Sequence, residues 1–557
     1  MACLSLFVFL VILVVLAFPP VCYVHGISCI ETERIALLSI KAGIDQSNNQ
    51  SLFSSWTGQD YCKWQGVSCN NESRHVIKLD LRRQYTYYNM PASKLNSSLI
   101  QLHHLKHLDL SMNNFKGSPI PDFIGSLANL EYLNLSNAGF NGILPHTFGN
   151  LSCLRYLDLS SNLYLEANDL HWLSGMTSLH HLDLSGVDLS NVHGWLHSIN
   201  MLSSLLVLKL SYAGLQTGGI HDTTLLHHHH LNFTSLRVLD LSHNYDLNFT
   251  LPEWLFNYTS LVELDLSACA LYGKLPVTVG NLSRLRVFSL SGNSFDGVIP
   301  ESLGNLGSLE ILDLSANQEL SGSIPEYFGN LGYLERLDLS ENKLNGRIPE
   351  SLSNLTNLVY LDLSWNMIRG VIPESFGNLT LLQHFYGARN NLSGKLPETM
   401  GNFVHLQALD LSQNAISGKL PDSFGNLSQL HYFSLQGSDI NGTLPKGMGN
   451  LCKLQTLDLT GNMISGGIDD LVDGLSKCRE NKYGSASESW EGLGTLNLGN
   501  NMLNGTIPEN IGKLSKLFEL NLSSNSLMGV LTESHFANLV NLKYLDLSLQ
   551  LFAIECK

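Results

Sequence analysis

Repeated aspartates and one run of histidines are the residues whose types first suggest chemistry in this chain. The segment LDLS places aspartates such as Asp338 and Asp362 at intervals of 24 or 25 residues. Catalytic carboxylates work as a pair with different roles, so an identical repeat of aspartates indicates a solvated face instead. The HHHH run at residues 227–230 has no other spaced ligands, so we predict no metal site and no cofactor.

Motifs of the common enzyme classes are absent from the sequence. H-E-x-x-H, G-x-S-x-G, the phosphate-binding G-x-x-x-x-G-K-[ST] and the protein-kinase signatures do not occur. The formal net charge of -16 is spread without a long run of one sign, which disfavours nucleic acid as a partner. We therefore expect a binding protein and not an enzyme.

A repeated segment organises most of the chain. Residues 334–357, LERLDLSENKLNGRIPESLSNLTN, are nearly copied 24 or 25 residues before and after, and we count 19 such units between residues 76 and 548. Leu337 and Leu339 alternate with polar residues, which predicts a short strand with one buried face. One unit cannot bury enough apolar surface to fold alone, so the units must stack and form one curved parallel sheet.

Other positions of the unit predict its turns. The ninth position is Asn in 12 of the 19 units, and an amide there can satisfy backbone groups at the turn that follows the strand. Cys269 takes this position once, so we predict a buried substitute and not a reactive thiol. The G-x-I-P element predicts a far side built of extended and 3₁₀-like segments. The pattern is irregular at 179–235 and interrupted by an insertion at 466–492.

The first residues indicate export. The apolar stretch at 6–18 has 13 residues, fewer than the roughly 20 that a membrane-spanning helix needs, so residues 1–26 are interpreted as a secretory signal peptide, with a membrane anchor as the alternative. Eight of the ten cysteines follow this segment, and export allows them to form disulfides. Cys452 and Cys478 are 26 residues apart, about one repeat, and are predicted to pair at the base of the insertion.

Sixteen Asn-x-Ser/Thr sequons accompany the repeat, which itself spells GNLS and NLT. Glycosylation of several is expected in an exported chain. The candidate sites are Asn96, Asn150, Asn281, Asn354, Asn378, Asn426 and Asn521.

A candidate ligand surface lies on the outward positions of the strands. Residues two, four and seven places after the first Leu of a unit face out of the concave side, and aromatic and arginine residues gather there in neighbouring units. These residue types anchor interfaces because they combine large contact area with hydrogen-bond donors. The predicted ligand-binding residues are Arg336, Glu341, Tyr360, Trp365, His384, Tyr386 and Arg389.

Two segments before the repeats carry a family resemblance. CIETERIALLSIKAGI and LFSSWTGQDYCKWQGVSC, together with L-x-G-x-I-P, resemble the plant extracellular leucine-rich-repeat receptor-like proteins that lack a kinase, which include fungal-xylanase receptors and disease-resistance proteins. The resemblance implies an α/β solenoid, a plant-type leucine-rich-repeat superhelix with a parallel concave β-sheet. It also implies a helical, disulfide-bonded N-terminal cap over residues 27–75.

The resemblance implies details of this cap. Cys62 and Cys69 match one disulfide of the family, whereas Tyr61 replaces the expected partner of Cys29. The cap helix of the family corresponds to residues 31–43. Its apolar residues Ile35, Leu38 and Ala42 are expected to cover the end of the first repeat.

The family also implies a function. We expect an extracellular recognition module that binds a pathogen-derived or endogenous peptide, protein or glycan and signals in defence through a co-receptor kinase at the plasma membrane. The alternatives are a soluble polygalacturonase-inhibitor-like protein in the apoplast, or a truncated decoy that does not signal. Because Gln550 replaces the ladder Asn, residues 549–557 are expected to form an aberrant tail of a shortened chain, whose longer relatives continue into a membrane helix.

Overall fold

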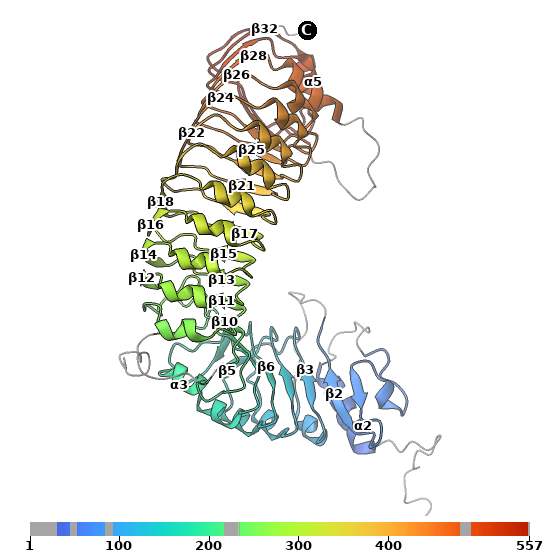
Figure 1. The fold of residues 1–557 in the computed structure, drawn as a ribbon. Helices are drawn as coiled ribbons and strands as arrows, with labels where there is room; N and C mark the ends of the chain where they lie inside the picture. Colours follow the sequence, from blue (N-terminus) through green and yellow to red (C-terminus); the bar gives the residue numbers. More distant parts are fainter. Residues whose placement is uncertain are drawn as a thin grey trace, which may run out of the picture. The chain divides into compact units, whose positions relative to one another are not determined.

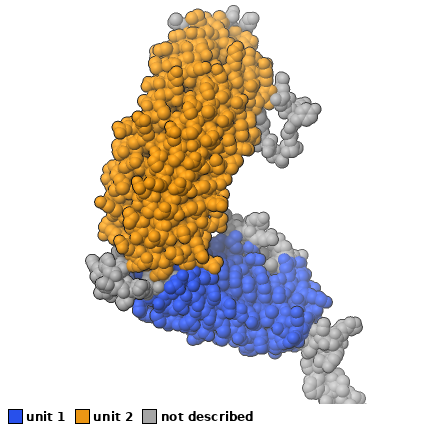
Figure 2. Space-filling model, in the orientation of Figure 1, with its two compact units in different colours: residues 1–221, 230–236 blue, residues 222–229, 237–557 orange. Residues whose placement is uncertain are grey.

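The computed structural model describes residues 30–44, 53–83, 93–216, 232, 234–478 and 492–554. The predicted signal peptide at 1–26, Cys29 and the histidine run at 227–230 lie outside these residues. The chain divides into two compact units (Figure 2). Unit 1 comprises residues 1–221 and 230–236, and unit 2 comprises residues 222–229 and 237–557.

Each unit has a main sheet to which every repeat contributes one short strand. In unit 1 an antiparallel strand, β1 (Val67–Cys69), precedes six parallel strands. These are β2 (Val76–Asp80), β3 (His107–Asp109), β4 (Tyr132–Asn134), β6 (Tyr156–Asp158), β8 (His181–Asp183) and β9 (Val207–Lys209).

Unit 2 contributes thirteen parallel main-sheet strands within its described residues. They are β10 (Val238–Asp240), β11 (Glu263–Asp265), β13 (Val287–Ser289), β15 (Ile311–Asp313), β17 (Arg336–Asp338), β19 (Tyr360–Asp362), β21 (His384–Tyr386), β23 (Ala408–Asp410), β25 (Tyr432–Ser434), β27 (Thr456–Asp458), β29 (Thr495–Asn497), β31 (Glu519–Asn521) and β33 (Tyr544–Asp546). The parallel strands of the two units equal the 19 repeats counted in the sequence.

Further strands form additional sheets on the other side of many repeats, a two-stranded sheet in unit 1 and a four-stranded and an eight-stranded sheet in unit 2 (Figure 1). In unit 1 these are β5 (Asn141–Ile143) and β7 (Tyr164–Glu166). In unit 2 they are β12 (Tyr272–Lys274), β14 (Ser294–Val298), β16 (Glu319–Ser323), β18 (Lys343–Asn345), β20 (Arg369–Gly370), β22 (Asn391–Gly394), β24 (Ala415–Lys419), β26 (Asp439–Thr443), β28 (Met463–Gly466), β30 (Met502–Gly505), β32 (Ser526–Leu531) and β34 (Leu551–Ile554).

Short 3₁₀ helices connect the two sheets. Most follow the Pro of G-x-I-P, since Pro fixes φ and needs no hydrogen-bond acceptor at a helix start. In unit 1 they are η1 (Tyr61–Lys63), η2 (Ser97–Gln101), η3 (Asp122–Ser126), η4 (His146–Asn150) and η5 (His171–Gly175). In unit 2 they are η6 (Glu253–Asn257), η7 (Val277–Asn281), η8 (Glu301–Asn305), η9 (Glu326–Asn330), η10 (Glu350–Asn354), η11 (Glu374–Asn378), η12 (Glu398–Asn402), η13 (Asp422–Asn426), η14 (Lys446–Asn450), η16 (Glu509–Lys513) and η17 (Glu533–His535).

Buried asparagines link neighbouring repeats, as the sequence predicted for the ninth position. The Nδ2 of Asn366 donates to the carbonyls of Leu339 in the preceding repeat (2.9 Å) and of Leu363 in its own (3.2 Å). Its Oδ1 accepts from the backbone N–H of Leu344 at 2.9 Å. One amide therefore satisfies groups of two repeats that water does not reach. Cys269 fills this position as predicted, fully buried with Sγ 3.0 Å from the Leu241 carbonyl.

The cap helix α2 (Glu31–Ile44) lies at the predicted place but buries a different face. The prediction that Ile35 and Ala42 cover the first repeat is wrong, because both are exposed, Ile35 to 56%. The buried stripe contains Ala36, Leu37 and Ile40, at the spacing of one helical face. A charged residue, Glu33, continues the same stripe and is only 2% exposed.

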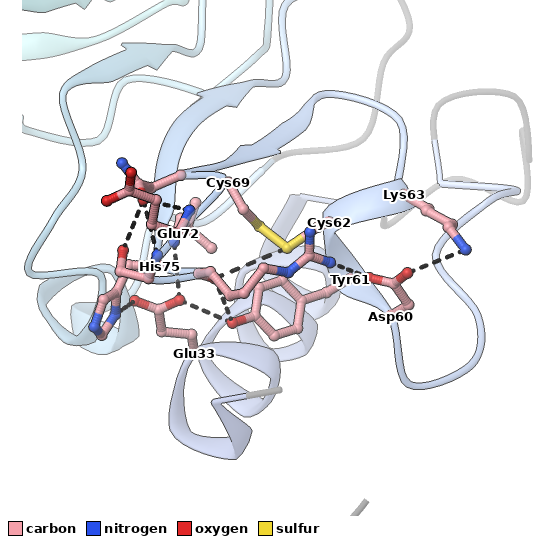
Figure 3. The surroundings of a disulfide bond; sticks show 12 residues. Glu33, Asp60, Tyr61, Cys62, Lys63, Cys69, Glu72 and His75 are labelled. Carbon is pink, nitrogen blue, oxygen red and sulfur yellow. Dashed lines mark hydrogen bonds and ion pairs between the residues drawn. A yellow bond between two sulfur atoms is a disulfide. The ribbon is translucent and has the colours of Figure 1, made fainter. Parts of the chain in front are cut away.

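Hydrogen bonds compensate the burial of Glu33 (Figure 3). Its carboxylate accepts from the Tyr61 hydroxyl at 3.1 Å and from the Val76 backbone N–H at 3.0 Å, and it lies 3.0 Å from Nδ1 of His75. The family resemblance implies a cysteine at this place, the partner of Cys29, and Tyr61 stands there instead. In this chain a hydrogen-bonded carboxylate therefore ties the helix to the cap at that place.

Two disulfides staple the described residues. Cys62 pairs with Cys69 in the cap, and Cys452 pairs with Cys478. Both pairs are those predicted from the sequence. Cys478 directly follows α5 (Asp469–Lys477), the helical part of the insertion, so this bond fixes the insertion to the preceding repeat. Residues 479–491 of the insertion lie outside the described residues.

The irregular segment at 179–235 holds two main-sheet strands, β8 and β9, and a single-turn helix, α3 (Trp195–Ile199). At the other end of the repeats, Gln550 takes over the role of the ladder Asn. Its Oε1 accepts from Leu527 N–H at 2.9 Å, and its Nε2 donates to the Leu522 carbonyl. Strand β34 then pairs in parallel with β32. The repeat pattern thus continues to Ile554, beyond the boundary at 548 expected from the sequence.

The buried network of the cap makes a first prediction. Glu33→Ala leaves the Val76 N–H without its carboxylate acceptor and removes one acceptor of the Tyr61 hydroxyl, which keeps the Arg74 carbonyl at 3.2 Å, so we expect it to lower the free energy of unfolding by about 2 kcal/mol or more. Tyr61→Phe removes one hydrogen bond and should cost about 1 kcal/mol. Ile35→Ala is the control, with an expected effect of about 0.5 kcal/mol or less. Urea denaturation of the three variants measures this order, and a larger loss for Ile35→Ala than for Glu33→Ala would contradict it.

Candidate functional site

Three neighbouring main-sheet strands, β17, β19 and β21, and the turns that follow them carry the predicted ligand-binding residues. Strands β17, β19, β21 and β23 are parallel and paired without a register shift. Arg336 is therefore beside Tyr360, and Tyr360 beside His384, on one face of the sheet. The predicted residues other than Glu341 form two contacting groups, which we together call the main-sheet cluster: Arg336, Tyr360, His384 and Tyr386 in one, and Trp365 and Arg389 in the other.

Two guanidinium groups lie over aromatic rings in this cluster. The Cζ of Arg336 is 3.7 Å from the ring centroid of Tyr360, and the Cζ of Arg389 is 4.1 Å from that of Trp365. Each contact contributes about 0.5–1 kcal/mol at an exposed site. The rings also limit where each guanidinium can move, so both cations are held at the sheet surface.

Three further contacts join the rings. The Tyr360 centroid is 5.9 Å from that of His384 and 5.8 Å from that of Tyr386, and the His384 and Tyr386 centroids are 6.2 Å apart.

Burial is the main cause that raises the pKa of Tyr360 and Tyr386, and the charges of nearby aspartates add to it. Burial, followed by the charge of Arg336, lowers the pKa of His384. At neutral pH the cluster therefore presents protonated hydroxyls and a neutral imidazole between two cations.

The backbone at the seventh place of the unit adopts the left-handed conformation. The φ angle is 55° at Glu341 and Trp365 and 54° at Arg389; most other repeats also have a non-glycine residue with positive φ here, such as Tyr212, and a few have a glycine such as Gly292. A bulky residue in this conformation costs about 1 kcal/mol relative to glycine. Trp365 is also 54% exposed, so it contributes little core packing in return. This combination favours a role at the surface for Trp365.

The two arginines differ in their partners. Arg336 Nη2 lies 2.8 Å from Asp338 Oδ2, and this ion pair largely neutralises the charge of Arg336. Arg389 is exposed, and within the described residues its guanidinium has a ring contact but no carboxylate within 4 Å. Glu341 is exposed on the other edge of the same face. Arg389 therefore retains free donors for an acidic group from outside the chain.

A second row of rings lies on the main sheet of unit 1, and it was not predicted from the sequence. The rings of His107, Tyr132, Tyr156 and His181 stack on four consecutive strands with centroids 4.0, 4.3 and 4.1 Å apart. All four stand two residues after the first Leu of their units, at the first outward place. The rule that located the main-sheet cluster therefore also locates this stack.

The described residues were also searched for metal and membrane sites. They contain no group of three or more His, Cys, Asp or Glu side chains that could hold a metal ion. No helix among them is both long and apolar enough to cross a membrane. Burial raises the pKa of the Cys269 thiol to about 12, so it stays protonated at neutral pH.

Family comparisons match both the cap and the repeats. The family described as Leucine rich repeat N-terminal domain matches residues 30–70. Two families described as leucine rich repeat match further along the chain. The first matches 103–163, 128–189 and 320–368, and the second matches 284–306, 308–331, 405–427, 453–475 and 492–514.

Curated relatives of the chain are plant receptor-like proteins. Receptor-like protein EIX1 of Solanum lycopersicum is 38% identical over 270 residues, which are 46% of this chain and 26% of the relative. Receptor-like protein 6 of Arabidopsis thaliana is 32% identical over 241 residues, 42% of this chain and 23% of the relative. The matched part thus spans about a quarter of these relatives.

Solved plant ectodomains share the fold. The crystal structure of PEPR1 with AtPEP1 matches with a TM-score of 0.71 at 28% identity, covering 94% of this chain and 69% of that one. The structure of the Arabidopsis receptor kinase HAESA in complex with the peptide hormone IDA and the co-receptor SERK1 matches with a TM-score of 0.71 at 27% identity, covering 94% and 82%.

The ring stack of unit 1 predicts a pH dependence. Burial is the main cause that lowers the pKa of His107 and His181 in the folded chain, so the unfolded chain binds more protons below about pH 6.5. The free energy of unfolding should therefore fall as the pH drops from about 7 to about 5. The double variant His107→Gln with His181→Gln should lack the part of this decrease in unfolding free energy that the two histidines cause.

Thermal unfolding of both proteins across this pH range provides the measurement. Carboxyl groups such as Asp183 titrate in both proteins, so the difference between the two curves isolates the histidines. Equal pH slopes for the wild type and the double variant would show that the stack does not penalise the charged imidazole.

Proposed function

This chain belongs to the leucine-rich-repeat family, and on that premise we propose that it is an extracellular recognition module, which binds its ligand on the main-sheet cluster of unit 2. The function is binding and not catalysis. The ligand is a pathogen-derived or endogenous molecule, and the complex engages a co-receptor kinase in a defence response at the plant cell surface.

The observation that carries the proposal is the guanidinium-and-ring surface on consecutive strands. Tyr, Trp and Arg are the residues that dominate the energetics of interfaces, and here five such side chains, which contact one another in two groups, are not buried in the core. Trp365 is exposed and held in a conformation that glycine would adopt more easily. A ligand that covers the Trp365 ring would offset this cost by removing the ring from water.

The chemistry of the cluster favours a peptide with an acidic group. Arg389 offers a guanidinium whose donors have no carboxylate partner among the described residues, and a carboxylate can accept two of them together. The hydroxyls of Tyr360 and Tyr386 are held protonated and can donate to backbone carbonyls. Apolar ligand side chains would contact Trp365.

Two of the structural relatives support a peptide and a co-receptor as partners. The PEPR1 structure contains AtPEP1, and the HAESA structure contains a peptide hormone together with SERK1. The curated relatives are receptor-like proteins, which supports the extracellular location. Ligand binding to an ordered, repeated face is also consistent with a scaffold whose buried positions are fixed while its outward positions vary.

The binding test uses a displayed peptide library, because it does not depend on knowing the natural ligand. Peptides selected on the wild-type chain should be enriched in Asp and Glu. Trp365→Ala with Tyr386→Ala should weaken these peptides by about 2 kcal/mol or more, a loss of about thirtyfold in affinity. Arg389→Gln should weaken acidic peptides more than their amidated counterparts. Calorimetric titration gives both affinities.

Tyr327→Ala serves as the matched control. Tyr327 is 52% exposed like Trp365, but it belongs to η9, on the helical part of the repeat and not on the main sheet. We expect unchanged peptide affinity in this variant and similar thermal stability in all of them. If the selected peptides bind the Trp365/Tyr386 double variant as well as the wild type, the ligand site is elsewhere and the proposal fails.

A further inference from the structure

Six sequons share one structural position. Each asparagine is the last residue of a five-residue 3₁₀ helix, and each is exposed. They are Asn150 of η4, Asn257 of η6, Asn281 of η7, Asn354 of η10, Asn378 of η11 and Asn426 of η13. The sequence analysis named five of them and omitted Asn257.

The local backbone leaves these side chains free. In Asn354, Asn378 and Asn426 the backbone carbonyl accepts from the N–H two residues later, on the Ser or Thr of the sequon, at 2.8–2.9 Å. The backbone is thereby satisfied without the side-chain amide. Within the described residues no hydrogen bond of the six side-chain amides is observed, so a substituent on Nδ2 displaces nothing.

Asn96 contrasts with this group. Its Oδ1 accepts from the Ser98 backbone N–H, and its Nδ2 donates to the carbonyl and the hydroxyl of Ser39, all at 3.0 Å. These bonds cap η2 and join it to the cap helix α2. A sugar on Nδ2 would collide with Ser39, because a glycan is bulky and needs an open surface.

Two sequons on the main sheet are also engaged. Oδ1 of Asn521 accepts from the N–H and the hydroxyl of Ser523 at 3.0 and 2.7 Å, and its amide lies against Gly499, where a Cβ would be 2.9 Å from Nδ2. Asn134 binds Ser136 in the same way. Both amides lie within the strand array and not on its edge.

We propose that N-linked glycans of the folded chain line the edge formed by the ends of the 3₁₀ helices, at the six asparagines of this register, and that Asn96, Asn134 and Asn521 remain unmodified. Folding selects against a glycan on the engaged amides, since the sugar would have to break their contacts. A glycan-lined edge leaves the main-sheet face uncovered. The inference depends on export but not on the identity of any ligand.

Two repeats provide a way to add a site in the same register. Asn305 ends η8 and Asn330 ends η9, and both are exposed, but glycine stands where the sequon needs Ser or Thr. A Cβ on Gly307 or Gly332 would meet no atom within 4 Å, and neither glycine has a positive φ. Gly307→Ser and Gly332→Ser therefore complete a sequon without steric cost.

The test is peptide mapping by mass spectrometry of the full chain secreted from plant cells, after enzymatic removal of glycans in heavy-oxygen water. We expect the isotope label at the six asparagines and not at Asn96, Asn134 or Asn521. A label on Asn521 as frequent as that on Asn378 would overturn the proposal, as would a secreted chain in which the six asparagines carry none.

The glycine variants test the register independently. Gly332→Ser should add one glycan, at Asn330, with unchanged secretion, and Gly307→Ser should do the same at Asn305. Circular dichroism before and after deglycosylation confirms that the variants are folded. Folded, secreted variants that gain no glycan at either position would show that this register does not determine occupancy.

Discussion

The buried asparagine at the ninth place of each unit is the interaction on which the rest of the structure depends. The Asn366 amide binds carbonyls of two repeats and one backbone N–H, all shielded from water. Without it the Leu344 N–H would be buried and unsatisfied, at about 1–3 kcal/mol, and the Leu339 and Leu363 carbonyls would each lose one of two asparagine donors, keeping Asn342 and Asn390. The residue before it, Trp365, is thereby fixed in the left-handed conformation that directs its side chain outward. The scaffold and the recognition surface thus share one turn.

Each unit has two kinds of position, buried and outward-facing, and the proposed function uses the outward-facing ones. Leu337 and Leu339 are fully buried, and apolar residues recur at their places in nearly every unit, while the outward places are free to differ. Arginines and rings fill these places on β17, β19 and β21, which brings residues 53 positions apart in sequence, Arg336 and Arg389, onto one face. Exposed sequons occupy the ends of the 3₁₀ helices instead, so the proposed glycans and the proposed ligand site would use different surfaces of the same repeat.

Most of the fold could be predicted from the repeat, because each position of the unit has a single physical role. Strand positions, the ladder asparagines, the Cys452–Cys478 disulfide and the adjacency of the main-sheet cluster followed from spacing, whereas the Cys62–Cys69 disulfide followed from the family resemblance. The buried face of α2 did not, because apolar periodicity cannot anticipate a buried Glu33 whose carboxylate is satisfied by Tyr61 and Val76. Gln550 was misjudged for a similar reason, since its longer side chain reaches the same backbone groups as Asn.

Hydrogen–deuterium exchange of Asn366→Ala tests the central claim most directly. The variant leaves the Leu344 N–H without its acceptor and removes one of the two asparagine donors to each of the Leu339 and Leu363 carbonyls, so exchange across residues 339–345 and 363–370 should accelerate at least about tenfold, with smaller accelerations in distant repeats. Asn357→Ala, which removes one exposed hydrogen bond, should leave exchange nearly unchanged. Protection across both segments equal to that of the wild type would contradict the account, because the repeats would then be joined without the ladder.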